Sequence, residues 1–236
     1  MKRTVMALAF AAATAPPEIH AFEFPTEAAI ERPFSLDVPE REPDMAAENY
    51  PALFDRTLGH EGGYTNDPRD PGNWTGGKVG VGKLLGTKFG IAANTFPHLD
   101  IKNLTVEHAR RIYKGLYWDK VKGDELPAGI DWAVFDYAIN SGPFRAIVGL
   151  QRALGVADDG KLGPVTLEAL RKTNPRRVVN ALCDERLKLM KSLKHWPTYK
   201  KGWTRRVSEV RAAALSMTDA PPTLLARVTS LLKQAA

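Results

Sequence analysis

The sequence predicts a mainly α-helical fold of the α+β class with one small β-hairpin, and three observations carry this prediction. Apolar residues recur every three to four positions through most of the chain beyond residue 104, which is the spacing of one helix face. A glycine-punctuated run at residues 76–91, with short Val and Leu segments, is typical of a small hairpin. With 236 residues, of which 44% are hydrophobic, the chain is long enough to bury a core in one large domain or two small ones.

The first 48 residues differ in composition from the rest of the chain. Residues 1–21 contain Lys2 and Arg3, an apolar run and small residues before Phe22, a pattern that resembles a secretory signal peptide cleaved after Ala21. An unprocessed, disordered start is the alternative. Residues 22–48 carry eight acidic residues against two arginines, are rich in proline and lack apolar periodicity, so we expect a disordered linker.

The first predicted helix begins near Asn49, which can cap it, and ends at Gly62-Gly63, where glycine permits a left-handed terminus. Phe54, Leu58 and Glu61 lie at positions i, i+4 and i+7, so the carboxylate shares the apolar face that the helix buries. Burial and the negative end of a helix both raise the pKa of a carboxyl group. Glu61 is therefore our candidate for a general acid that keeps its proton near neutral pH.

The loop that follows is dense in Asp, Pro and Gly and offers a second carboxylate. Hydrolysis of a glycosidic bond needs an acid for the leaving oxygen and a carboxylate that activates water or stabilises positive charge on the sugar. Asp70, nine positions after Glu61 and raised into the loop by flanking prolines, is our candidate for that carboxylate, with a purely structural loop role as its alternative. Asp67 competes with Asp70, but an Asx turn also explains it. Thr75 is our candidate for holding the attacking water.

Three aromatic residues and one amide are candidates for binding sugar rings. Tyr64 and Trp74 flank the carboxylates of the loop. Tyr137 and Asn140, on a predicted buried helix, are candidates for the floor of the cleft. A core tyrosine and a helix-ending asparagine are the simpler explanations of these last two residues.

The glycine-rich hairpin region contains a partial nucleotide-binding pattern. Residues 77–83 fit the first seven positions of a P-loop, but Leu84 stands where Ser or Thr binds magnesium, and no hydrophobic strand precedes the pattern. We therefore expect no nucleotide binding.

Helices account for most of the remaining chain. An amphipathic helix begins near Thr105, and the segment Ile130–Ile139 is apolar on nearly every side, which predicts a buried central helix. Residues 158–164 form a turn that leads into a helix with Pro164 in its first turn. Further helices are expected at residues 144–154, at residues 176–196, where Pro197 breaks the helix, and at residues 201–215, followed by an amphipathic tail at residues 217–236.

Composition excludes several classes of site. The formal net charge is +6, and the acidic linker makes the part after residue 48 more basic still, which favours a polyanionic partner. The single cysteine, Cys183, rules out an intrachain disulfide and a cysteine-rich zinc site, and the five histidines lack metal-ligand spacing. We expect no metal and no cofactor. No apolar run is long enough for a membrane span in the mature form, and the basic helices lack a motif for reading nucleic acid.

Several short blocks together resemble a known family. In the first part of the chain they closely resemble the signature of glycoside hydrolase family 108, the N-acetylmuramidases: Glu61-Gly62-Gly63-Tyr64, Asn66-Asp67-Pro68, Asp70-Pro71-Gly72 and Lys88-Phe89-Gly90-Ile91. Later blocks look like the peptidoglycan-binding region that accompanies this family: Asn140-Ser141-Gly142-Pro143, residues 150–155, Gly163-Pro164 and Gly202-Trp203. The match covers roughly residues 50–215.

The resemblance implies a lysozyme-like fold, a catalytic glutamate at Glu61 and an endolysin-like muramidase that acts on peptidoglycan. It places the catalytic domain at residues 49–142 and the peptidoglycan-binding region at residues 143–216. In members of this family a threonine commonly leads directly from the glycine pair into the segment that matches residues 88–91. Here residues 76–86 intervene, so either Thr75 or Thr87 can be the matching threonine of the site. We expect an exported monomer of the periplasm or cell wall, or one delivered there during phage lysis. A lytic transglycosylase and a non-catalytic wall-binding protein are the alternatives.

Overall fold

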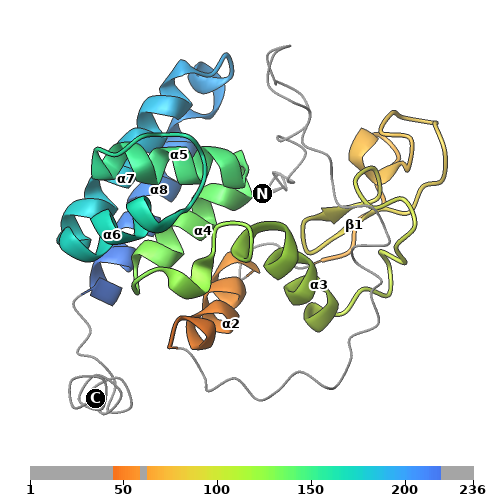
Figure 1. The fold of residues 1–236 in the computed structure, drawn as a ribbon. Helices are drawn as coiled ribbons and strands as arrows, with labels where there is room; N and C mark the ends of the chain where they lie inside the picture. The colour runs from red at the N-terminus through yellow and green to blue at the C-terminus, as the bar shows by residue number, and fades with distance from the viewer. Residues whose placement is uncertain (1–44, 59–62, 219–236) are drawn as a thin grey trace, which may run out of the picture. The chain divides into compact units, whose positions relative to one another are not determined.

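The computed structural model describes residues 45–58 and 63–218, which belong to two compact units (Figure 1). The first unit contains residues 51–116, and the second contains residues 117–218 together with the start of the first described helix. The described chain is mainly helical with one small antiparallel sheet, which confirms the predicted α+β class. The predicted signal sequence, most of the predicted linker, Glu61 and most of the predicted tail lie outside the described residues.

Helix α2, Met45–Leu58, begins four residues before the predicted start. Asn49 does not cap it, because its Nδ2 donates instead to Oδ2 of Asp131, 3.0 Å away. Pro51 consequently lies inside the helix. The capping prediction was wrong because the asparagine amide has a partner 82 positions away in sequence, which no local pattern indicates.

The first unit contains a hairpin of two-residue strands, β1 (Thr87–Lys88) and β2 (Ile91–Ala92), which is shorter than the predicted one at residues 76–91. Phe89 and Gly90 form its turn with φ angles of 53° and 73°, as the type I′ turn of a two-residue hairpin requires. The Tyr113 hydroxyl donates to the carbonyl of Phe89 at 3.0 Å and holds this turn. Residues 76–86 are instead a loop, in which one isolated bridge pairs Leu84 with Trp74.

Helix α3, Val106–Tyr113, packs on the end of α2 within the first unit. Thr105 caps α3 as predicted, with its side chain accepting from the amide of His108. Phe54 of α2 meets the ring of Tyr113 edge to face, with centroids 5.4 Å apart. The guanidinium of Arg110 lies over the same Phe54 ring, 5.6 Å from its centroid. A π-helical turn, η3 (Lys114–Trp118), follows α3.

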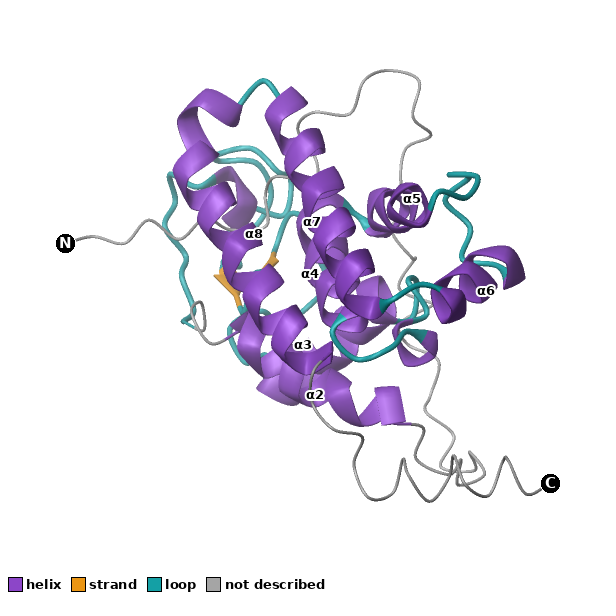
Figure 2. Ribbon diagram, turned by 90° about the vertical axis from the view of Figure 1, so that its left-hand side faces the viewer, coloured by secondary structure: helices purple, strands orange, loops and turns teal. Residues whose placement is uncertain are grey.

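In the second unit, α4 (Ile130–Ser141) is the central helix, and residues 130–139 are all buried, as predicted. It contacts α5 (Pro143–Leu154), α7 (Pro175–Ser192) and α8 (Trp196–Thr218). Figure 2 shows α7 and α8 running side by side along α4. Gly142, with a φ of 87°, separates α4 from α5. None of the described helices is long and apolar enough to cross a membrane.

The connections between the later helices follow the sequence closely, with one correction. The buried Gln151 holds the turn before α6 (Pro164–Lys172) by donating to Asp159 and accepting from the amide of Gly160. Asn174 caps α7 by accepting from two amides. Helix α7 ends at Ser192, and Pro197 lies in the first turn of α8 rather than only ending the helix before it, a position where a missing N–H costs nothing.

A buried ion cluster joins three helices of the second unit. The carboxylate of Asp136 on α4 lies 2.7 Å from Nη1 of Arg186 on α7 and 2.7 Å from Nη2 of Arg206 on α8. The two arginines hold the pKa of Asp136 below its ordinary value against the opposing effect of burial. Cys183 is buried on α7, as expected of a core residue, and burial raises the pKa of its thiol.

Candidate active site

The candidate site lies in the first unit, in the loop between α2 and β1. Glu61 is outside the described residues, and the described part of the candidate site is residues 63–87. The loop is ordered by one short 3-10 turn, η2 (Pro71–Asn73), and by backbone bonds to the hairpin, where the amides of Thr65 and Thr87 each donate to the other's carbonyl. These bonds join the beginning of the loop to β1.

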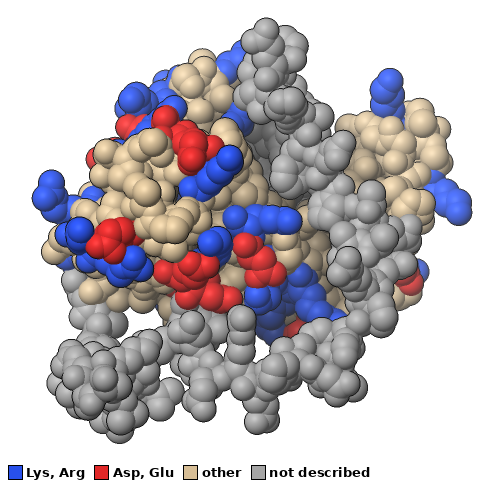
Figure 3. Space-filling view, viewed as in Figure 1, with Lys and Arg blue, Asp and Glu red and all other residues tan. Residues whose placement is uncertain are grey.

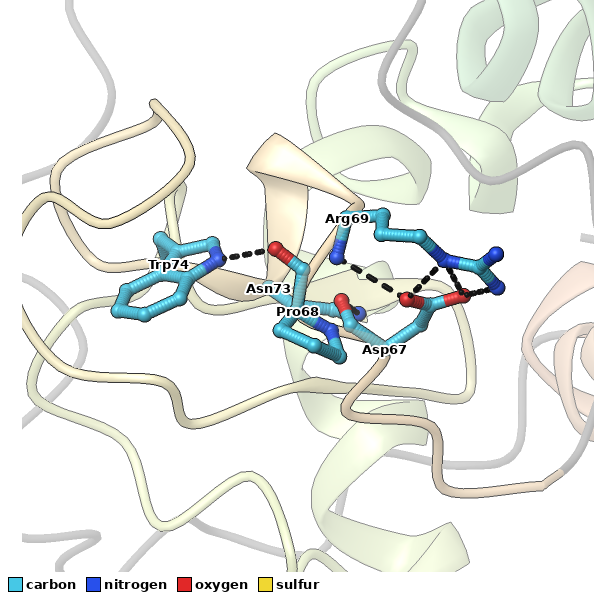
Figure 4. A network of polar contacts seen from close by, with 5 residues as sticks. All are labelled: Asp67, Pro68, Arg69, Asn73 and Trp74. Carbon is cyan, nitrogen blue, oxygen red and sulfur yellow. Dashed lines mark hydrogen bonds and ion pairs between the residues drawn. The ribbon is translucent and has the colours of Figure 1, made fainter.

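Asp67 is held by Arg69, two residues further along the loop (Figure 4). Its Oδ1 accepts from the Arg69 amide at 3.0 Å, and its Oδ2 accepts from the guanidinium Nη2 at 2.6 Å. These hydrogen bonds lower the pKa of Asp67 to about 2. Asp67 therefore makes the Asx turn that the loop pattern suggested, and which of Asp67 and Asp70 is the second catalytic carboxylate stays a prediction.

Asp70 caps the turn η2. Its Oδ1 accepts from the amide of Gly72 at 2.8 Å, and its carbonyl accepts from the amide of Asn73 at 3.1 Å. Within residues 45–58 and 63–218 no group donates to its Oδ2. Asp70 therefore has the structural, turn-capping role that the loop pattern left open, and it fills that role through Oδ1.

Asn73 is the residue that sequence reasoning missed. It is completely buried and its Nδ2 donates to the carbonyl of Asp67, while its Oδ1 accepts from the hydroxyl of Thr87 at 2.7 Å. Its own carbonyl accepts from the amides of Leu85 and Gly86. Asn73 thus connects the carboxylate loop to the hairpin. A single asparagine between glycine and tryptophan is a common turn pattern, so the sequence alone does not predict that Asn73 connects the loop to the hairpin.

The two aromatic residues of the loop are half-buried. The indole Nε1 of Trp74 donates to the carbonyl of Pro68 at 2.9 Å, which sets the ring at the end of the network opposite Arg69 (Figure 4). The ring of Tyr64 lies against Gly86, where an added Cβ would come within 2.7 Å of the tyrosine Cε2. Both rings are therefore fixed in place and keep part of their surface open.

The structure distinguishes the two candidate threonines by their surroundings. The hydroxyl oxygen of Thr75 accepts from the amide of Lys83 at 2.9 Å, and the side chain is half-buried. Thr87 is 4% exposed, and its hydroxyl proton is given to Asn73. Of the two hydroxyls, that of Thr75 accepts from a backbone amide on a half-buried side chain, whereas that of Thr87 donates to a buried side chain. Which threonine assists the reaction stays a prediction.

Tyr137 and Asn140 belong to the second unit, on α4. Tyr137 is 2% exposed, packs against Gly149 and lies under the guanidinium of Arg186 at 5.4 Å. Burial raises its pKa to about 12. The Nδ2 of Asn140 donates to the carbonyl of Asp136 at 2.9 Å. These are the core-tyrosine and helix-end roles that were the simpler explanations, and their contact with sugar stays a prediction.

The described residues contain no group of three His, Cys, Asp or Glu side chains that is arranged to hold a metal ion. The chemistry that the loop offers is that of carboxylates, amides and hydroxyls. Paired with a protonated carboxylic acid, this set suffices for hydrolysis of a glycosidic bond.

Comparison with known proteins agrees with this set of groups. Residues 54–142 match the family model described as Glycosyl hydrolase 108, and residues 145–208 match the one described as Predicted Peptidoglycan domain. Among the solved structures, one titled "Structure of Brucella abortus SagA" is 41% identical, with a TM-score of 0.59, over 75% of this chain and 97% of that chain. No match is found among the curated proteins. The helical fold with its small sheet is lysozyme-like, as the resemblance implied.

Proposed function

The chain belongs to the glycosyl hydrolase 108 family, and from that premise we propose that it is an N-acetylmuramidase of the lysozyme type. The coarser activity, hydrolysis of glycosidic bonds in peptidoglycan, follows from the two matched regions. The finer proposal is that it cleaves the β-1,4 bond between N-acetylmuramic acid and N-acetylglucosamine. The observation that carries it is that the glycosyl hydrolase match, residues 54–142, contains both Glu61 and the ordered Asp70 loop.

In the proposed reaction, Glu61 protonates the glycosidic oxygen as the bond to the sugar breaks. Asp70 accepts a proton from the attacking water through Oδ2, while Oδ1 stays on the Gly72 amide. Thr75 orients that water, with Thr87 as the alternative. Because water attacks the face opposite the leaving group, this arrangement inverts the anomeric carbon. A product of retained configuration would contradict the assignment of Asp70.

The domain arrangement and location belong to the same proposal. We assign catalysis to residues 49–142 and wall binding to residues 143–216, preceded by an export signal at residues 1–21 and a linker at residues 22–48. Two regions directed at peptidoglycan support a place in the periplasm or cell wall. A monomer that is delivered to the wall during phage lysis would carry out the same chemistry, and this setting is the alternative to export by the cell.

Zymography on purified peptidoglycan tests the proposal. Wild type should clear the wall polymer and release reducing sugar ends, and Glu61→Gln should lose all but a small fraction of that activity. Glu107→Gln, which changes an exposed carboxylate on α3, is the matched control and should keep full activity. Retained activity in Glu61→Gln would refute the assignment of the acid.

Mass spectrometry of the digested wall separates the competing functions. A hydrolase leaves products that have gained a water molecule, whereas a lytic transglycosylase, which needs only the glutamate, leaves anhydro-muramoyl ends that are one water lighter. Binding to sacculi with no new ends of either kind would indicate a non-catalytic wall-binding protein.

A further inference from the structure

The turn between α7 and α8 carries an uninterrupted run of positive charge. From residue 186 to residue 208 the chain contains eight Lys and Arg residues and no Asp or Glu. Arg186 and Arg206 form ion pairs with the buried Asp136. The other six are exposed: Lys188, Lys191, Lys194, Lys200, Lys201 and Arg205.

Most of these exposed cations have no carboxylate beside them. Lys188 lies 3.5 Å from Glu185, and Arg205 lies 3.7 Å from Glu209. The remaining four lysines form no ion pair with any residue that the structure describes. Over α5 and α6, by contrast, Figure 3 shows acidic and basic side chains interspersed. The α7–α8 turn is therefore a place where an anion gains attraction without first displacing an internal partner.

Aromatic rings line the same turn. Trp196, Tyr199 and Trp203 lie at positions i, i+3 and i+7 of α8, which places them along one helix face. The rings of Tyr199 and Trp203 are stacked, with centroids 5.7 Å apart and planes 26° from parallel, and those of Trp196 and Trp203 are 6.2 Å apart. All three residues are half-buried. Seven helical residues span about 10 Å, so the rings form a strip and not a single contact.

We propose that this surface, the aromatic strip with its exposed lysines at residues 188–205, binds the glycan strand of peptidoglycan together with the carboxylates of its stem peptides. The rings pack against the apolar faces of successive sugars, and the lysines attract the carboxylates of the stem peptides. This inference rests on the proposed function and assigns wall binding within the peptidoglycan-binding region to particular residues.

A lipid surface fits these residues less well. Membrane-surface helices add large apolar side chains that enter the acyl region. The exposed large apolar residues of the described chain are Val79, Val81, Val106, Phe144 and Val165, and none of them lies in this surface. Partly open rings beside lysines suit a polymer that presents both flat sugar faces and carboxylates.

Cosedimentation of the full chain with purified sacculi at low temperature tests the proposal. Two double variants remove the two features separately: Tyr199→Ala with Trp203→Ala, and Lys191→Gln with Lys194→Gln. Phe144→Ala and Lys120→Gln are the matched controls, because both change exposed residues outside the surface. Each double variant should weaken sacculus binding about tenfold, as loss of a central interface contact does, and the controls should bind as wild type. Measured melting temperatures should match that of wild type, which checks that every variant is folded.

Two further arms identify the ligand and separate this inference from the proposed function. Amidation of the wall carboxylates should remove the effect of the lysine variant and leave that of the aromatic variant. Release of reducing ends from a short soluble muropeptide should be the same in both double variants as in wild type. Binding of the same variants to anionic phospholipid vesicles is measured in parallel. Unchanged binding of the double variants to sacculi, or a loss of binding to vesicles alone, would overturn the inference. If wild type released no ends yet bound sacculi through these residues, the inference would stand and the proposed catalysis would fail.

Discussion

At the residue scale, the carboxylates of the candidate loop differ in how their oxygens are used. Both oxygens of Asp67 accept from Arg69, whereas Asp70 gives one oxygen to the Gly72 amide. A carboxylate with one oxygen anchored keeps its orientation and can still accept a proton from water. The same anchoring makes any Asp70 variant ambiguous, because a loss of activity can follow from a loss of the turn.

Two substitutions at Asp70 separate these effects. Asp70→Asn keeps an oxygen that accepts from the Gly72 amide but removes the base, so wall hydrolysis should fall by about 10²- to 10⁴-fold with an unchanged melting temperature. Asp70→Ala should lose as much activity and also about 0.5–2 kcal/mol of stability through the missing cap. Reducing-end release and urea unfolding measure the two quantities. Wild-type turnover in Asp70→Asn would leave only the structural role.

Asp131 predicts how stability depends on pH. Burial raises its pKa from 3.8 to about 6, against opposing hydrogen bonds from Asn49 and from the amides of Trp132 and Gly129. Because the folded state binds the proton more tightly than the unfolded state, this stabilisation is complete below pH 3.8 and is lost as the pH rises through about 6. The loss amounts to about 3 kcal/mol. In Asp131→Asn, unfolding free energies should lack this decline between pH 4 and pH 6; an identical decline would assign it to another group.

At the scale of single elements, the sequence predicted those that depend on local signals and missed those that depend on long-range contacts. The starts of α3 near Thr105 and of α7 near residue 176 and the buried α4 were predicted because each signal lies within one or two helical turns. The start of α2 was not, since Asn49 bonds to Asp131. The hairpin was predicted but placed too broadly, because glycine content does not show which residues pair.

Glycines of the loop and hairpin region allow a matched test of this element. Gly86 and Gly80 have φ angles of 85° and 78°, but an added Cβ at Gly86 meets the Thr65 carbonyl at 2.4 Å, whereas at Gly80 nothing lies within 4 Å. Gly80→Ala should therefore lower the free energy of unfolding by only about 1–2 kcal/mol, because alanine is strained in the left-handed conformation. Gly86→Ala should cost about 1–3 kcal/mol more through crowding and should lower wall hydrolysis by displacing Tyr64. Equal unfolding free energies would show that the bridge between Thr65 and Thr87 tolerates the methyl group.

At the scale of the whole chain, the ion cluster of the second unit joins residues that are far apart in sequence. Asp136 is bonded to residues 50 and 70 positions away, and Asp136 and Arg186 are almost completely inaccessible to solvent. The hydrophobic setting makes an unpaired charge costly. The packing of α4, α7 and α8 therefore depends on all three partners being present.

Asp136→Asn should destabilise the protein by about 3–5 kcal/mol, because it leaves Arg186 buried without a counter-charge. Asp184→Asn is the control: it removes an exposed carboxylate that pairs with Arg211 between α7 and α8 and should cost at most about 1 kcal/mol. Urea unfolding of the two variants measures the difference. Similar losses would mean that the buried cluster contributes no more than a surface pair.

The sequence by itself determined the helical class, the buried central helix, the starts of α3 and α7 and the family signature, because each depends on residues close together in the chain. It also singled out Glu61 and Asp70, whose roles remain proposals. Only the tertiary structure decided that Asn73 joins the loop to Thr87 and that Arg69 forms an ion pair with Asp67. It also decided that Asp136 pairs with both Arg186 and Arg206. The reason is physical: periodicity and capping act within a few residues, whereas the partner of a polar side chain is whichever group folding brings within about 3 Å.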